Sequence, residues 1–346
     1  MALFFDTLEE AVPETFTWVQ EHILVPALEE GQVFIAMAAR AHYQALNLKG
    51  LWPVLRKMEI RPLRPFDRED VQIQARLLGM QPLEDITLYT GGVPGIKKKV
   101  VLEKSYQEKA TLPDKAVEII FTYIAEKVEE VKDILLVMAA FRWFNDRLLA
   151  HIAHCFWPDR YQDSRRRTGN RLARKMLATW WVGEHPQGYG YTVAPELRPV
   201  LDRYHFSHHP QQHLETHRLA FQWFKQEVAA GDWESLVDQV YHLSAAWYDR
   251  KQNADLAFPE DLPLAPTTEE RVSCLRDLLS RGLEGVRSEE QAKARERICR
   301  SLEEGEEFRS VLDQTEIEQL VAFVSQDGAA TLAKEQNAQG GMNGQG

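Results

Sequence analysis

Residues 1–64 alternate short apolar runs with helical pattern, and this alternation constrains the fold of the chain more than any other feature. Ala2–Phe5 and Val33–Met37 have the length and composition of buried strands, and Met58–Ile60 is a weaker third. A helix is expected between the first two strands, over Pro13–Glu29. Strands separated by helices indicate a parallel sheet. Because a parallel sheet is normally covered on both faces, three strands predict only part of one.

From residue 65 the pattern is mainly helical. Asp67 is a candidate helix cap, and a strong break falls at Thr90–Gly95 before more helices continue to residue 130. Over 131–205, helices precede two aromatic and β-branched runs, Trp180–Val182 and Tyr189–Val193, with a turn predicted over Gly183–Gly188. These runs predict a hairpin. Helices followed by one hairpin are typical of a winged helix.

Residues 206–334 are expected to be helical throughout. His213–Ala230 and Trp233–Trp247 predict an antiparallel helix pair, because only a short connection separates them. Further helices after a proline-rich linker suggest a helical-repeat-like region, although no fixed period names a repeat class. The tail over 335–346 is rich in Gly, Gln and Asn, and we expect it to be disordered. The predicted fold class is therefore mainly α with a small parallel α/β part.

Composition narrows the setting in which the chain works. A net charge of −11 argues against a surface that coats nucleic acid. No apolar run is long enough for a membrane span, and the first 30 residues carry acids where a signal peptide needs bases. The cysteines form no C-x-x-C pair and are expected to be reduced: Cys155, Cys274 and Cys299. We expect a cytoplasmic protein with no membrane contact.

Three short features follow one another along the chain. Asp6 follows the first strand, Arg40 follows the second, and Gly92-Val93-Pro94 lies in the helical region after the sheet. This order, with a winged helix behind it, resembles the STAND branch of the AAA+-related P-loop ATPases, the group that contains the NB-ARC and NACHT signalling proteins. The resemblance covers about Met1–Trp247. It implies a partial P-loop core over 1–64, a helical lid over 65–130 and a winged-helix domain over 131–205.

The resemblance also implies roles for single residues. Asp6 would be the Walker B acid that holds Mg²⁺ through water, and Glu9 is the nearer match to the second acid of that motif. Arg40 would be the sensor-1 arginine that contacts the γ-phosphate. His205 is the nearest match to the winged-helix histidine that contacts the β-phosphate in family members. The residues that would contact adenine are Gly92, Val93 and Pro94.

Each feature also has an ordinary interpretation. Asp6 could cap a helix, Arg40 could lie on the surface, and Gly91–Gly95 could be a plain turn. The order of the three features, more than any one of them, favours the family interpretation.

The phosphate-binding Walker A pattern G-x-x-x-x-G-K-[ST] is absent from the sequence. In the family, that loop supplies the backbone nest and the lysine that hold the phosphates. Charge-assisted hydrogen bonds contribute about 1.5–3 kcal/mol each, so losing several weakens nucleotide binding strongly. We therefore expect the rear portion of a signalling ATPase switch that neither binds nor hydrolyses ATP alone. ATP or ADP and Mg²⁺ would be the cofactors of an intact relative, with Asp6 at the metal.

Two other function classes stay open. The chain could be a non-enzymatic interaction module whose C-terminal helices bind a protein partner or a signal and support oligomerisation. It could also be a winged-helix DNA-binding regulator, although DNA is the least favoured partner because a run of charge is usually a solvated face. That hypothesis depends on basic residues just before the hairpin: Arg165, Arg166, Arg167, Arg171 and Arg174.

Histidines cluster between residues 205 and 217. His213 and His217 are four residues apart and share a helix face, as zinc ligands can. Leu214 follows His213, so the H-E-x-x-H pattern of zinc proteases is not met. We expect these histidines to serve in packing and helix capping rather than in metal binding.

Overall fold

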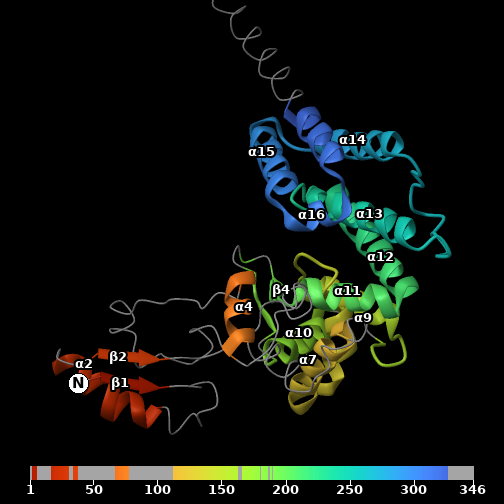
Figure 1. Ribbon diagram of the computed structural model, residues 1–346. Helices are drawn as coiled ribbons and strands as arrows, with labels where there is room; N and C mark the ends of the chain where they lie inside the picture. The colour runs from red at the N-terminus through yellow and green to blue at the C-terminus, as the bar shows by residue number, and fades with distance from the viewer. Residues whose placement is uncertain are drawn as a thin grey trace, which may run out of the picture. The chain divides into compact units, whose positions relative to one another are not determined.

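The computed structural model describes residues 2–5, 17–30, 34–37, 67–77, 112–162, 166–179, 181–185, 188 and 190–325. Most of these residues are helical, which confirms the expectation of a mainly α protein (Figure 1). The predicted third strand at Met58–Ile60 and the tail over 335–346 lie outside the described residues.

The first two predicted strands form a parallel pair. β1 (Ala2–Phe5) lies beside β2 (Phe34–Met37), with Ala2 opposite Phe34 and Phe5 opposite Met37. The described residues between them are helical and include a π-helical turn, η2 (Gln20–Leu24), that leads into α2 (Val25–Glu30). A helical connection between parallel strands agrees with the alternation in the sequence.

The predicted helix cap at Asp67 is confirmed. Asp67 Oδ1 accepts hydrogen bonds from the backbone N–H groups of Glu69 and Asp70, each at 2.9 Å, at the start of α4 (Arg68–Leu77). These bonds satisfy amide groups that have no partner within the helix. The next described helix is α7 (Leu112–Val128), which ends in the 3₁₀ turn η7 (Glu129–Val131).

The chain divides into two compact units. One comprises Met1–Val131 with Ala173–Leu197, and the other comprises Lys132–Leu172 with Arg198–Gly346. The first division falls after Val131. The segment over 131–205, predicted as one winged-helix domain, is shared between the two units.

Helices and then a hairpin follow in the predicted order. α8 (Lys132–Met138) and α9 (Asp146–Phe156) precede α10 (Arg166–Leu177). Asn145 caps α9 by accepting hydrogen bonds from the two N–H groups of Arg147 and Leu148 at 3.0 and 2.9 Å.

The predicted hairpin pairs β3 (Val182–Glu184) with β4 (Tyr191–Val193) in antiparallel register. Gly183 lies within β3, so the turn begins later than the sequence predicts. Gly188 has a φ of 76°, a left-handed conformation that glycine adopts without a steric penalty.

Three consecutive helices begin the part of the chain over 198–325. α11 (Arg198–His208) leads into α12 (Pro210–Ala229), which packs along α13 (Ser235–Gln252). The turn between α12 and α13 contains Gly231, with a φ of 97°. The predicted helix pair is thus present, although α12 begins before His213 and α13 continues beyond Trp247.

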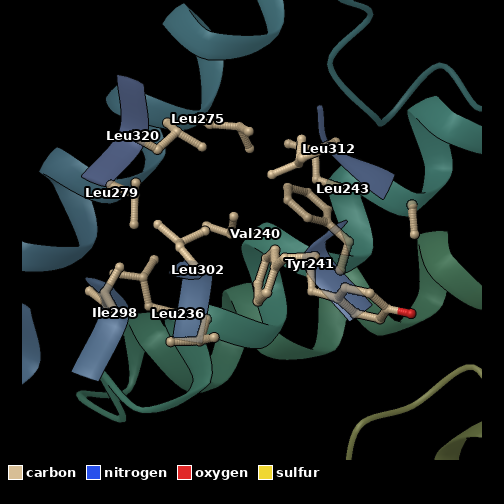
Figure 2. Close-up of a cluster of buried hydrophobic side chains, with 14 of the residues drawn as sticks. Leu236, Val240, Tyr241, Leu243, Leu275, Leu279, Ile298, Leu302, Leu312 and Leu320 are labelled. Atoms are coloured by element: carbon tan, nitrogen blue, oxygen red, sulfur yellow. The ribbon is translucent and has the colours of Figure 1, made fainter. Parts of the chain in front are cut away.

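The remaining described helices share one hydrophobic core with α13. They are α14 (Thr268–Glu284), α15 (Ser288–Glu304), α16 (Glu306–Val311) and a helical segment over 314–325. Figure 2 shows how side chains from these helices meet those of α13, with Tyr241 and Leu243 among them. Thr267 and Glu270 form a capping box at the start of α14, which fixes where that helix begins.

Gly169 in α10 provides a test of the packing between α9 and α10. A Cβ atom at this position would overlap the backbone carbonyl of Asp146. Glycine to alanine inside a helix normally stabilises a protein by up to about 1 kcal/mol. Here we expect Gly169→Ala to destabilise by about 1–3 kcal/mol, because backbone atoms must move.

Urea denaturation of Gly169→Ala and of Gly183→Ala measures the difference. Nothing lies within 4 Å of a Cβ atom at Gly183, so that variant is the matched control. A Gly169→Ala protein as stable as the natural chain would show that the two helices are not in this close contact.

Candidate functional site

Most of the predicted nucleotide-site residues lie outside the described residues: Asp6, Glu9, Arg40, Gly92, Val93 and Pro94. His205 is the predicted nucleotide-site residue that the structure describes. The described strands nevertheless bear on the prediction. Phe5 and Met37 are partners at the ends of two parallel strands, and Asp6 follows Phe5 directly in the sequence.

The basic residues before the hairpin lie largely on α10. Arg165 is outside the described residues, whereas Arg166, Arg167, Arg171 and Arg174 are exposed. Arg166 Nε lies 3.6 Å from Asp146 Oδ2, so part of this charge is compensated within the protein. Arg167, Arg171 and Arg174 are spaced to share one face of the helix.

A different set of residues forms the most concentrated group of titratable side chains. His205 on α11, His213 and His217 on α12, and His242 on α13 are all buried, with exposed fractions of at most 4%. We call these four residues the histidine cluster. All of them belong to the unit that contains 198–325.

His213 lies between two carboxylates. Its Nδ1 is 2.7 Å from Asp249 Oδ2, and its Nε2 is 3.0 Å from Asp202 Oδ1. Burial alone would lower the pKa of His213, but Asp202 and Asp249 outweigh it and raise this pKa to about 10. A protonated His213 donates to both carboxylates, and this arrangement connects α11, α12 and α13.

The other three rings are held neutral. Burial, together with the charge of His213, lowers the pKa of His205 to about 3 and the pKa values of His217 and His242 well below the usual range. The arginines Arg142 and Arg198 further lower the pKa of His242.

Hydrogen bonds hold two of these neutral rings together. His217 Nδ1 lies 2.8 Å from His242 Nδ1, so one ring donates and the other accepts. His205 Nε2 is 3.3 Å from Gln212 Oε1. Within the described part of the chain, His205 Nδ1 and His242 Nε2 have no hydrogen-bond partner.

Aromatic side chains surround these rings. The ring of Phe224 stacks on His242 with 5.6 Å between centroids, and Phe141 lies against the same ring at 5.0 Å. Tyr241 and Phe206 contact His217 and His213 edge-on. This apolar shell strengthens the electrostatic interactions inside it.

The structure changes the interpretation of the histidines in two ways. The packing role expected for His213 and His217 is confirmed by their burial. The capping role is wrong, because the N-cap of α12 is His209 and its side chain makes no capping bond. His205 has no exposed surface, so contact with a nucleotide phosphate would require the histidine cluster to open.

Sequence reasoning missed His242, Asp202 and Asp249. Each is one of several polar residues in its helix, and its partners lie at a distance along the chain: Asp249 is 36 residues from His213. Only the packing of three helices brings them together.

A second polar set, half-buried around the buried carboxyl group of Asp238, lies in the same unit. Arg142 Nε is 2.6 Å from Glu307 Oε1, with Asp238 Oδ1 3.6 Å from the same guanidinium. Arg198 lies 3.7 Å from Glu307, and Trp143 Nε1 donates to Asp238 at 2.8 Å. We call these five residues the Arg142 network. Burial raises the pKa of Asp238, whereas the two arginines hold the pKa of Glu307 below its usual value.

Comparisons with known proteins give no match. Neither protein-family profiles nor curated proteins nor solved structures resemble the chain significantly. None of the helices in the described ranges is both long and apolar enough to cross a membrane. The three cysteines carry free thiols, as expected.

The neutral histidines predict a loss of stability in mild acid. His205, His217 and His242 stay unprotonated in the folded state but titrate near pH 6.5 when unfolded. Because the unfolded state binds more protons, the free energy of unfolding decreases as the pH falls below about 6.5, by up to about 1.4 kcal/mol per pH unit for each ring. His213 acts in the opposite sense: its contribution is complete below about pH 6.5 and is lost as the pH rises to about 10.

Urea denaturation between pH 5 and 6.5, in buffer with EDTA, measures the acid part of this dependence. This pH window lies above the usual titration of carboxylates in an unfolded chain, which falls near about pH 4. We expect His205→Gln to reduce the slope, although part of it remains from the other rings with lowered pKa values, and His208→Gln, a change at an exposed neighbour on α11, to leave it unchanged. Equal slopes in the natural chain and in His205→Gln would contradict the neutral state of this ring.

Proposed function

We propose that the chain is the trailing portion of a STAND-type signalling ATPase and acts in a nucleotide-dependent conformational switch. The observation that carries this proposal is the parallel pairing of β1 with β2. In parallel neighbours the chain leaves both strands at the same edge of the sheet. Phe5 and Met37 end the two strands as partners, so the residues that follow them begin at one edge.

That edge is where a nucleotide site would be expected. Ligands of open α/β sheets bind beyond the carboxyl ends of the strands. Asp6 is the first residue after β1, and Arg40 is three positions after Met37. An acid for Mg²⁺ and an arginine for the γ-phosphate are two of the groups that phosphoryl transfer uses at such an edge.

The helical remainder supports the same proposal. α9, α10 and the β3–β4 hairpin follow the order of a winged helix, and helices continue through 198–325. In an intact relative, ADP would hold the lid and winged helix closed on the core. Exchange for ATP would shift the population toward an open, oligomerising state, with the C-terminal helices sensing a partner or signal.

Supplying the absent phosphate loop tests this proposal. A chimera places a strand and a G-x-x-x-x-G-K-[ST] loop from a STAND protein ahead of Met1. We expect the chain alone to show no ATP turnover and the chimera to bind ATP with Mg²⁺. Asp6→Asn in the chimera should reduce hydrolysis by at least about 100-fold, because the acid that holds the metal is lost.

Glu10→Gln, a neutralised acid four positions further on, is the matched control and should retain the activity of the chimera. Hydrolysis is measured as phosphate release, and affinity by calorimetry. ATP turnover by the unmodified chain that Asp6→Ala abolishes, or a chimera indifferent to Asp6→Asn, would contradict the proposal.

A second candidate is a non-enzymatic interaction module. It is favoured by the helices over 210–325, which share one hydrophobic core on both sides of the non-helical segment 253–267. The same chimera separates the two candidates. A folded chimera with no affinity for ATP or ADP would leave the interaction module as the better account.

The DNA-binding alternative leads to a separate expectation. The net charge of −11 opposes phosphate binding, and Arg166 is already close to Asp146. We therefore expect no DNA binding at low salt in a gel-shift assay. Salt-dependent binding that disappears when Arg167, Arg171 and Arg174 are changed to alanine would reverse this conclusion.

A further inference from the structure

Two members of the histidine cluster and one neighbouring aspartate have the arrangement of metal ligands. Asp202, His213 and His217 each offer one ligand atom, and the three atoms lie within 4.8 Å of one another. His213 and His217 are on consecutive turns of α12, so their rings lie on one face of the helix. Asp202 approaches from α11, with its Oδ1 3.0 Å from His213 Nε2.

The Nδ1 atoms of His213 and His217 already have hydrogen-bond partners. His213 Nδ1 lies 2.7 Å from Asp249, and His217 Nδ1 lies 2.8 Å from His242. A histidine that binds a metal through one nitrogen normally bonds the other to a carboxylate or a similar group, which fixes the ring. His213 meets this condition, and the His217 ring is held instead by a hydrogen bond to the neutral ring of His242. Nε2 of each ring is then the nitrogen left for a shared ligand.

The charges around His213 also favour a bound metal ion. His213 lies between the carboxyl groups of Asp202 and Asp249. When both are ionised, one proton on His213 balances only one of their two charges. A dication in place of the proton would bring the group to neutrality, and buried charges are stable when they are paired or bound to a metal.

We propose that Asp202, His213 and His217 bind one divalent transition-metal ion. Asp202 Oδ1 and the Nε2 atoms of the two histidines are the ligands, and Asp249 and His242 orient the rings. Two imidazoles and one carboxylate suit Zn²⁺, Co²⁺ or Fe²⁺ better than Mg²⁺ or Ca²⁺, which prefer oxygen ligands. This inference is independent of the proposed nucleotide switch.

The burial of the ligands defines how the ion enters. Asp202 has a side chain that is 30% exposed, whereas that of His213 is 5% exposed. The ion therefore arrives on the side of Asp202, where water can complete its coordination. A tetrahedral ion with three protein ligands keeps one position for such a water.

Metal titration of the full chain tests the site. The protein is produced without a histidine tag, stripped with EDTA and titrated with Co²⁺, whose visible absorption reports nitrogen and oxygen coordination. We expect saturation at one ion per chain, displacement by Zn²⁺, and a matching zinc content by elemental analysis. A rise in the melting temperature with Zn²⁺ should accompany binding, because the ion binds the folded state.

Four variants locate the ion. Asp202→Asn and His217→Gln should lose the Co²⁺ spectrum, and Asp249→Asn should weaken binding by about 10–100-fold. His209→Gln, an exposed histidine one residue before α12, is the control and should bind as the natural chain does.

Circular dichroism shows whether each variant is folded, and Asp202→Asn keeps the test decisive because its side chain is partly exposed and nearly unchanged in shape. No metal beyond background in the natural chain would overturn the proposal. So would unchanged binding in Asp202→Asn, or loss of binding in His209→Gln.

Discussion

The hydrogen bonds of His213 to Asp249 and Asp202 are the interaction on which the helical unit depends. Each of its members comes from a different helix, so it fixes α11, α12 and α13 relative to one another. Burying ionised groups is costly, and removing one partner of such a set typically costs about 3–5 kcal/mol because a charge is left unpaired. The set therefore selects one packing of three helices that apolar contacts alone would specify less sharply.

Near this interaction, α13 buries apolar side chains at some positions and polar side chains at others. On one part of α13, Leu236, Val240 and Leu243 pack into the core that α14 and α15 complete (Figure 2). Other positions of α13 are polar: His242 and Asp249 form hydrogen bonds with His217 and His213 of α12. α13 is thus buried on several faces, and polar partners on α12 accompany part of that burial.

Local features were predictable from the sequence, and long-range features were not. The cap at Asp67 and the strand at Ala2–Phe5 follow from a few adjacent residues, and each appears where expected. His242, Asp202 and Asp249 carry no local signal, because their chemistry arises only when distant helices meet. The start of the hairpin turn was misplaced, since Gly183 is compatible with strand as well as turn.

The position of Trp143 within the Arg142 network has an optical consequence. Its indole donates a hydrogen bond to Asp238, and its ring lies 5.8 Å from Phe224, the side chain that stacks on His242. Indole fluorescence shifts in wavelength with the polarity and charge around it. Among the nine tryptophans of the chain, Trp143 is therefore one whose emission would change when the helical interior opens, without any added label.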